Sequence, residues 1–547
     1  MEKFLMAVIA RLKNLISERY FWKMNSLGFN AFYSLLTLIL FNKIFFEKVW
    51  AVNPDVLFVS LMAAVLFLLL NVACALLFWR RTAKPLAIIF TFLNAFVFYF
   101  MFVYHTAVDK VMLLNVLETD VQEVKALLNW DLFLIVGLLG VLPSFLIYKT
   151  DIVFGSGRAE VVKKVAVVLS AVVVSAAVIG LGYKDAAQFL RNNKPLKYYL
   201  IPANYVGAVI SVAKNKIREA GKPKETLKIG EDAALYPIWQ DNGKKNLFVF
   251  VVGETARAAN FSLNGYKKPT NAPLEKFGND ILSFRDVSSC GTSTAIALPC
   301  LFSHKGRKNF SKSQSYYTEN LLDVAQRAGY KVWWRGNVTG CKGICSRVES
   351  EILCKEDTCY DDILAQGLKE RLLKENKDMF VVLHQLGSHG PTYYKRYPET
   401  ESVFTPNCGT ERLDKCSREE ILNVYDNTLH YTSKNLAEVI EILQSLKDQY
   451  NPVLLYISDH GESLGENNIY LHAAPYALAP KEQTHVPLVL WFDDEFAAKF
   501  KLDRECLRKK LGNNYSQDNI FHSFLGLMGI KTKVYDKNLD IFSDCRL

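Results

Sequence analysis

Long apolar segments dominate the first third of the chain and constrain its fold more than any other feature. Five of them lie at 27–46, 56–79, 85–104, 132–148 and 165–183. A helix needs about 20 apolar residues to cross a bilayer, and each segment comes close to that length, although the fourth is short and contains Pro143. We therefore predict a transmembrane domain of five spans within residues 1–183.

Basic residues lie on one side of these predicted spans. They are concentrated in residues 1–24, in the turn at 80–84 and in the loop at 149–164. Because basic loops stay in the cytoplasm, an odd number of spans places everything after residue 183 on the far side of the membrane. The N-terminal stretch has no small-residue cleavage site, so we do not expect a cleaved signal peptide.

The cysteines are as unevenly distributed as the apolar segments. Cys74 is the only one of 11 that precedes residue 289. The other ten fall mostly in close sequential pairs: Cys290, Cys300, Cys341, Cys345, Cys354, Cys359, Cys408, Cys416, Cys506 and Cys545. This even number predicts disulfides in an oxidising compartment, and pairing of neighbours is the simplest connectivity, although the sequence does not fix it. A Cys-x3-Cys zinc site at Cys341 and Cys345 is the alternative for that pair.

The remainder of the chain has the pattern of a bridge followed by a globular domain. Residues 184–245 combine aromatic residues and prolines with a polar stretch, which predicts an interfacial segment and a linker. From residue 246 helical stretches such as 318–328 and 418–446 alternate with continuous apolar runs at 247–252, 331–334, 379–383, 453–457 and 488–491. Such runs are typical of buried parallel strands, so we predict an α/β domain with a mostly parallel sheet over residues 246–547.

The net charge of +10 is compatible with nucleic acid, an anionic membrane or anionic substrates as partners. The sequence has no basic run interleaved with aromatic residues, no zinc-finger spacing and no helix-turn-helix pattern. We therefore do not expect nucleic-acid binding.

Polar residues follow the predicted strands at the ends where parallel sheets bind ligands. Glu254 follows the first run, His389 follows the third, and Asp459 and His460 follow the fourth, with His472 12 residues further on. Imidazole and carboxylate ligands suit Zn²⁺, whereas magnesium favours oxygen ligands alone. The sequence therefore predicts a zinc site at this edge of the sheet.

A hydroxyl-rich run between Cys290 and Cys300 supplies a candidate nucleophile. If these cysteines closed a ring, the ring would fix the position of one hydroxyl, and Thr294 is our choice. A zinc ion beside Thr294 would lower the pKa of its hydroxyl, and the alkoxide could attack a phosphorus or sulfur centre. His389 and His472 would then hold the transferred group or a second metal ion.

The long loop at 105–131 is acidic and has a helical pattern. Asn115, Thr119 and Glu123 recur every four residues and so share one helix face. This face is either the solvated side of a helix at the membrane surface or a polar strip that contacts a ligand head group.

Several motifs together resemble the phosphoethanolamine transferases that modify lipid A of Gram-negative outer membranes. They lie at 251–257, 289–295, 387–394, 458–463 and 481–487, and the resemblance covers nearly the whole chain. It implies a multi-pass protein of the bacterial inner membrane whose periplasmic catalytic domain has the alkaline phosphatase and sulfatase fold. We also expect a monomer.

The resemblance also implies roles for individual residues. Thr294 would be the nucleophile, and the zinc ligands would be Glu254, Thr294, Asp459 and His460. His389 and His472 match residues that contact the phosphoryl group or a second zinc ion. The donor site would include Asn115, Thr119 and Glu123, and Lys342 matches a basic residue near the phosphate.

The implied reaction has two steps. Thr294 attacks the phosphate of phosphatidylethanolamine and releases diacylglycerol. The phosphoethanolamine then passes to a phosphate of lipid A, or to a core sugar, within lipopolysaccharide or lipooligosaccharide. The added ammonium group would offset negative charge and so weaken the binding of polymyxin and other cationic peptides, which confers antibiotic resistance.

Three other kinds of function fit parts of this pattern less well. A sulfatase needs Cys or Ser followed by x-Pro-x-Arg, and the run after Cys290 lacks this motif. A related phosphoglycerol transferase, or a phosphatase-type hydrolase, would keep the same metal chemistry and remains the alternative. A transporter or sensor is disfavoured because the predicted spans contain almost no ionisable residues, with Lys43 near the end of one.

Overall fold

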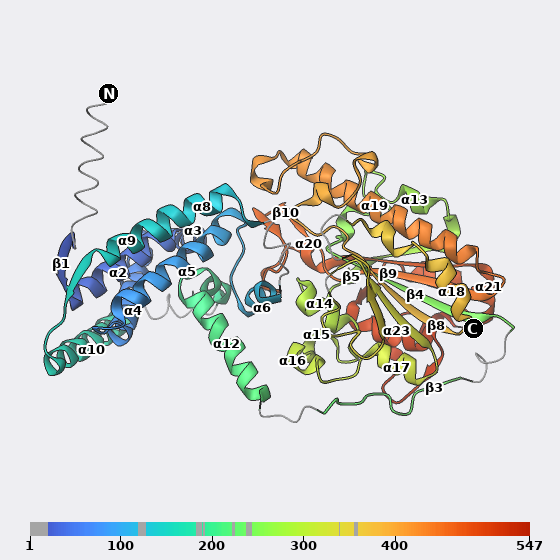
Figure 1. Ribbon diagram of the computed structural model, residues 1–547, viewed down its shortest axis with the longest axis horizontal. Helices are drawn as coiled ribbons and strands as arrows, with labels where there is room; N and C mark the ends of the chain where they lie inside the picture. Colours follow the sequence, from blue (N-terminus) through green and yellow to red (C-terminus); the bar gives the residue numbers. More distant parts are fainter. Residues whose placement is uncertain are drawn as a thin grey trace. The chain divides into compact units, whose positions relative to one another are not determined.

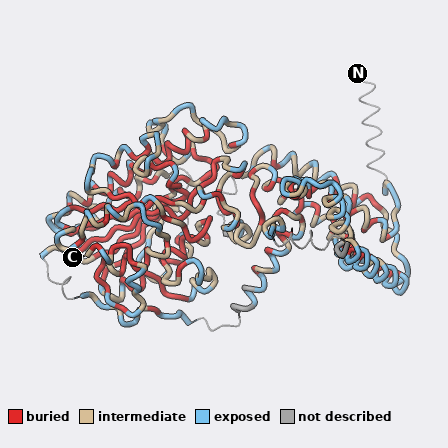
Figure 2. Tube along the Cα trace, turned by 180° about the vertical axis from the view of Figure 1, so that it is seen from behind, coloured by how far each residue is buried: buried red, intermediate tan, exposed pale blue. Residues whose placement is uncertain are grey.

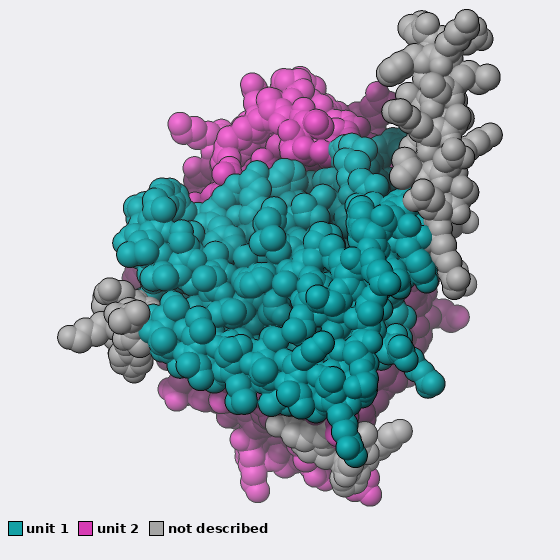
Figure 3. Space-filling model, turned by 90° about the vertical axis from the view of Figure 1, so that its left-hand side faces the viewer, with its two compact units in different colours: residues 1–109, 128–209 teal, residues 110–127, 210–547 magenta. Residues whose placement is uncertain are grey.

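A computed structural model describes the protein (Figure 1). It describes residues 20–118, 127–181, 189, 192–220, 225–236, 243–338, 340–354 and 359–546. The chain forms two compact units, which Figure 3 colours separately. The N-terminal unit comprises 1–109 and 128–209, and the C-terminal unit comprises 110–127 and 210–547. The predicted domain boundaries after residues 183 and 245 stay predictions.

Apolar helices build the N-terminal unit. Their bounds are α2 (Ser26–Phe41), α3 (Lys43–Val52), α4 (Val56–Leu77), α5 (Ala83–Val103), α8 (Trp130–Val136), η1 (Gly137–Val141), α9 (Leu142–Tyr148) and α10 (Gly157–Leu181). Side-chain caps start three of them, because Asn25 Oδ1 accepts from the Gly28 amide, Asp55 Oδ1 from the Leu57 amide and Asn129 Oδ1 from the Leu132 amide. In Figure 2 exposed segments are prominent along these helices, which suits helices surrounded by lipid.

Four helical runs in the described part of this unit are long and apolar enough to cross a membrane: Val56–Leu77, Ala83–Val103, Trp130–Tyr148 and Gly157–Val178. They correspond to the second to fifth predicted spans. The first predicted span is divided at Asn42 into α2, which has 16 residues, and α3. The fourth continues through Pro143, which comes just after the π-helical turn η1, where the regular bonding between residues four apart is interrupted.

An eight-stranded sheet forms the centre of the C-terminal unit. Its order is β13-β5-β12-β9-β4-β8-β6-β7, and the strands are β4 (Lys245–Gly253), β5 (Ile281–Ser288), β6 (Lys331–Gly336), β7 (Glu349–Ile352), β8 (Met379–His384), β9 (Tyr450–Ser458), β12 (His485–Phe492) and β13 (Asn514–Ser516). All neighbouring pairs are parallel except the two that include β12. The mostly parallel sheet is therefore confirmed, while β12 runs against its neighbours.

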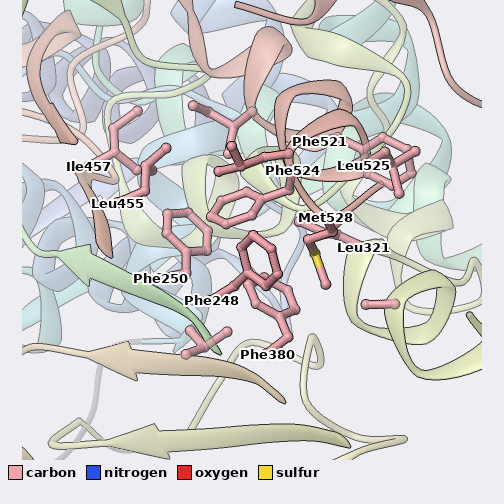
Figure 4. Close-up of a cluster of buried hydrophobic side chains, with 14 of the residues drawn as sticks. Phe248, Phe250, Leu321, Phe380, Leu455, Ile457, Phe521, Phe524, Leu525 and Met528 are labelled. Carbon is pink, nitrogen blue, oxygen red and sulfur yellow. The ribbon is translucent and has the colours of Figure 1, made fainter. Parts of the chain in front are cut away.

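The central strand β4 is buried on both faces, which explains its continuous apolar run. Phe248, Phe250 and Val252 point into one hydrophobic cluster, whereas Leu247 and Val249 point into a second cluster on the other face. Figure 4 shows the first cluster, where Phe250 lies near Phe524 with ring centroids 4.6 Å apart. The second cluster includes side chains of α19 (Arg418–Gln444). Hydrophobic packing on both faces of the sheet therefore holds β4 in place, and with it the sheet edge that carries Glu254.

The ten cysteines after residue 289 form five disulfides between sequential neighbours. The pairs are Cys290–Cys300, Cys341–Cys345, Cys354–Cys359, Cys408–Cys416 and Cys506–Cys545. The simplest pairing is the one observed, and the alternative of a zinc site at Cys341 and Cys345 is wrong. Cys74 is a free, buried cysteine of the N-terminal unit.

Candidate active site

Thr294 is the first residue of α14 (Thr294–Leu301), which follows β5. The Cys290–Cys300 disulfide joins the loop before this helix to the helix itself. The loop is tight, because a Cβ atom at Gly291 would lie 2.9 Å from Ile296 Cγ2. Thr294 is therefore held at a helix start within a closed ring, where N–H groups favour anionic ligands.

Two buried side chains contact the Thr294 hydroxyl, and a third buried side chain, that of Asp459, lies beside them. Thr294 Oγ1 lies 2.9 Å from Glu254 Oε1, 3.0 Å from Glu254 Oε2 and 3.2 Å from His460 Nε2. Glu254, Asp459 and His460 form a group whose potential metal-ligating atoms lie within 4.8 Å of one another. Glu254 directly follows β4 and Asp459 directly follows β9, and these two strands pair in parallel, so the fold brings both carboxylates to one edge.

The orientation of His460 leaves one nitrogen directed at Thr294. His460 Nδ1 lies 2.8 Å from the Gly461 carbonyl oxygen, which can only accept a hydrogen bond. Nδ1 therefore carries the hydrogen, and in the neutral ring Nε2 keeps its lone pair. This arrangement of a backbone carbonyl behind a ring is the one that orients histidine ligands in metal sites.

The charges at this point are concentrated and buried. Burial raises the pKa of Asp459 to about 7, and the neighbouring charge of Glu254 adds to the effect. Burial alone would lower the pKa of His460, but Asp459 and Glu254 raise it to about 10. Burial would raise the pKa of Glu254, yet the hydrogen bond and charge of His460 lower it overall. The two carboxylates thus need a positive charge beside them, which a bound cation would supply in place of the imidazole proton.

The two oxygen atoms of the Asp459 carboxylate have different surroundings. Asp459 Oδ1 accepts from the His460 amide at 2.7 Å, whereas Asp459 Oδ2 is buried with no hydrogen-bond partner among the described residues. His460 Nε2 lies 3.5 Å from this Oδ2 atom. A buried carboxylate oxygen without a donor fits a metal ligand better than a structural acceptor. The residues present therefore fit a metal ion.

His389 and His472 lie beside this group. The ring centroids of His460 and His472 are 4.6 Å apart, and those of His389 and His472 are 5.4 Å apart. Burial lowers the pKa of His389 to about 3, so its ring is neutral at pH 7. His472 Nδ1 lies 3.4 Å from the buried carboxylate of Glu462. The structure thus brings both predicted histidines to the edge that carries Asp459.

The other predicted residues divide into two groups. Lys342 lies within the Cys341–Cys345 loop. Its charge lies near His384, at the end of β8: burial of the His384 ring is the main cause that lowers the pKa of His384 to about 4, and the charge of Lys342 lowers it further. Asn115 lies on α6 (Lys110–Glu118), and this helix contacts α14. Thr119 and Glu123 lie outside the described residues.

Some residues that position the site were not identified from the sequence. Gln517 Oε1 accepts from the Cys290 amide at 2.7 Å, and Gln517 Nε2 donates to the Asp459 carbonyl at 2.6 Å, so one side chain ties the Thr294 loop to the end of β9. A Cβ atom at Gly387, where φ is +55°, would lie 2.6 Å from the Glu254 carbonyl. No sequence motif marks Gln517, because it comes from a segment more than 200 residues from Thr294.

Comparisons with known proteins identify the family of this chain. Residues 66–217 match the family model "Phosphoethanolamine transferase EptA/EptB", and residues 246–530 match the family model "Sulfatase". Phosphoethanolamine transferase EptA of Escherichia coli is 38% identical over 94% of this chain and 96% of its own length. The chain belongs to the phosphoethanolamine transferase EptA family. The predicted family resemblance is confirmed.

Other members of the family are similar over most of the chain. Phosphatidylethanolamine transferase Mcr-1 of Escherichia coli is 36% identical over 83% of this chain and 87% of its own length. The integral membrane protein lipooligosaccharide phosphoethanolamine transferase A of Neisseria meningitidis matches 95% of this chain and 98% of its own, with a TM-score of 0.90 and 37% identity. The family fold therefore includes both the apolar helices and the sulfatase-like α/β domain.

Proposed function

We propose that the protein transfers phosphoethanolamine from phosphatidylethanolamine to lipid A, or to a core sugar, through a phosphothreonine at Thr294. The distances from Thr294 Oγ1 to Glu254 and His460 carry this proposal, because they place a hydroxyl against a group fit to hold a metal ion. The names of the EptA and Mcr-1 relatives support the transferred group. The enzyme would act as a monomer in the bacterial inner membrane, with its catalytic unit in the periplasm.

In the first step Thr294 Oγ1 forms a bond to the donor phosphorus as its proton leaves. The bond between phosphorus and the glycerol oxygen breaks, and this oxygen takes up a proton as diacylglycerol departs. In the second step an acceptor oxygen attacks the same phosphorus and Thr294 Oγ1 is released with a proton. In-line attack at each step requires a nucleophile held in one place, which the ring around Thr294 provides.

We further propose that the metal is Zn²⁺, held by Glu254, Asp459, His460 and Thr294 Oγ1, since this set combines nitrogen and carboxylate oxygen. When bound, zinc would lower the pKa of the Thr294 hydroxyl and offset charge on the phosphoryl group. His389 and His472 would contact the phosphoryl oxygens or hold a second zinc ion. Lys342 would contribute positive charge near the phosphate, and Asn115, Thr119 and Glu123 would contact the donor head group.

The intact mass of the full-length protein tests the covalent step. We would incubate wild type, Thr294→Ala and Ser293→Ala with phosphatidylethanolamine, with zinc and with a chelator. Ser293 is the matched control because it carries the adjacent hydroxyl, whose oxygen has no hydrogen-bond partner among the described residues. We expect a gain of one phosphoethanolamine in wild type and Ser293→Ala, and none in Thr294→Ala or with chelator.

Two results would count against the proposal. A gain in Thr294→Ala would show that another residue is the nucleophile. A gain of phosphoglycerol from phosphatidylglycerol, with none from phosphatidylethanolamine, would assign the chain to the related phosphoglycerol transferases instead.

A further inference from the structure

The N-terminal unit contains a cavity of about 330 Å³. Its walls come from α2, α4, α5 and the segment at 200–206. The residues that line it include no charged side chain, and most are apolar, among them Leu66, Leu69, Leu70 and Val206. This volume lies at the small end of the range for ligand pockets, and the composition suits an uncharged, apolar ligand.

Two polar side chains in the cavity wall have an atom without a partner. Thr37 and Asn94 are 2% and 1% exposed, and both line the cavity. Asn94 Oδ1 accepts from the Tyr205 hydroxyl at 2.8 Å, whereas Asn94 Nδ2 and Thr37 Oγ1 have no hydrogen-bond partner among the described residues. An unpartnered polar group inside a membrane protein costs several kcal/mol, so these two atoms point to a missing ligand.

The cavity wall is held rigidly on its polar side. The Ile201 amide donates to Asn42 Oδ1, and Asn42 Nδ2 donates to the Ile201 carbonyl, both at 2.9 Å. Together with the bond between Tyr205 and Asn94, these contacts fix the segment at 200–206 against α2 and α5. On another side, Leu69 and Leu77 of α4 line the cavity and are 53% and 46% exposed. The cavity is therefore bounded partly by side chains that would contact lipid.

We propose that this cavity binds an ester-linked acyl chain of a glycerolipid. The chain would fill the apolar part, and the ester carbonyl would accept hydrogen bonds from Asn94 Nδ2 and the Thr37 hydroxyl. An ester suits this place because it is an uncharged acceptor, and the lining offers no charge for a phosphate or an amine. The site does not depend on the proposed transfer, because it lies in the N-terminal unit and involves no residue of the candidate active site.

Photo-crosslinking of the full-length protein in nanodiscs tests this inference. The probe is phosphatidylethanolamine with a diazirine on one acyl chain, and labelled peptides are mapped by mass spectrometry. We expect labelling of the stretch at 66–78. Ala73→Phe places a large side chain on the wall of the cavity and should reduce this labelling about tenfold, whereas Ala64→Phe, a matched change at another exposed position of α4 that is not part of the lining, should leave it unchanged. Equal labelling of the two variants would overturn the proposal.

A separate experiment tests the proposed hydrogen bonds to the ester carbonyl. Thr37→Val keeps the shape of the side chain and removes the hydroxyl, so labelling should fall about threefold. Unlabelled ester-linked phosphatidylethanolamine and diacylglycerol should compete with the probe better than ether-linked analogues. Stronger competition by diacylglycerol than by phosphatidylethanolamine would identify the reaction product as the source of the chain, and equal competition by the two lipids would identify glycerolipids in general. Equal competition by ether lipids, with no effect of Thr37→Val, would overturn the role of the ester.

The same labelling in a Thr294→Ala background separates this site from catalysis. That variant carries out no transfer if the proposed function is correct, yet its cavity is unaltered. Labelling should therefore equal that of wild type. A loss of labelling in this background would contradict a site independent of the reaction.

Discussion

In the C-terminal unit large aromatic side chains such as Phe250 and Trp491 are fully buried, whereas in the N-terminal unit Leu69 and Val173 are 53% and 66% exposed. Water drives the first arrangement, since burial removes apolar surface from it. The second arrangement suits lipid, in which exposed apolar surface has no such cost. A buried polar atom without a partner therefore has a different meaning in each unit: Asp459 Oδ2 lies in a candidate metal site, and Asn94 Nδ2 faces a cavity.

The largest effect is expected at the Asp459 carboxylate of the C-terminal unit. Asp459→Asn should reduce transfer by at least about 100-fold, because it removes a proposed metal ligand and weakens the charge stabilisation that this site offers. The same change should not lower the free energy of unfolding, because it removes a buried charge whose neutralisation is already favoured. Transfer assays, zinc content and urea unfolding would measure this. Full activity without bound metal would contradict it.

The second-largest effect is expected from truncating one apolar side chain in each unit. Phe250→Ala should lower the free energy of unfolding of the C-terminal unit by about 4 kcal/mol, since Phe250 is fully buried beside Phe302 and Phe524. Leu169→Ala on α10 removes a side chain that is 60% exposed and should cost less than about 1 kcal/mol. Pulse proteolysis in urea would report both values. Equal costs would show that Leu169 packs against protein rather than lipid.

The disulfides give a comparison within the C-terminal unit. Cys506–Cys545 joins residues 39 apart and Cys341–Cys345 joins residues 4 apart. Loop-closure entropy predicts that replacing both cysteines by alanine costs about 4 kcal/mol for the longer loop and about 2 kcal/mol for the shorter one. Urea unfolding of the two double variants would test this order. Cys74→Ala is the control, because the Cys74 thiol forms no disulfide and this substitution therefore removes no cross-link.

The smallest effect concerns two buried threonines. Thr270 Oγ1 donates to the Asn260 carbonyl at 2.6 Å in the C-terminal unit, so Thr270→Val should cost about 1–2 kcal/mol. Thr37 has no partner for its hydroxyl among the described residues, so Thr37→Val in lipid-free detergent should be neutral or stabilising. Thermal unfolding of both variants would measure the difference. A clear loss of stability in Thr37→Val would mean that its hydroxyl already has a partner.

The sequence predicted the parts of the fold that depend on local patterns. The five apolar runs from residue 247 onward are the strands β4, β6, β8, β9 and β12. The reversed direction of β12 was not predicted, because a buried strand looks apolar whichever way it runs. The sequence pattern does not reveal the division of the first predicted span at Asn42, because a single polar residue hardly interrupts a long apolar run.

The candidate site was predictable where its residues follow strands. Glu254, Asp459 and His460 were placed together because parallel strands bring their ends to one edge. Gln517 was not predictable, because its role depends on two hydrogen bonds formed only after distant segments meet. The cavity beside Asn94 likewise requires three helices and a fourth segment to be in place.

The C-terminal unit takes residues 110–127 from between two apolar helices and the rest from residue 210 onward. The chain therefore passes between the units three times, after residues 109, 127 and 209. A gene fragment that starts at residue 210 would encode the catalytic sheet without α6, the helix that contacts α14. Inheritance of the C-terminal unit by recombination at a single point would separate the proposed nucleophile, Thr294, from that helix, so we expect the two units to be inherited together.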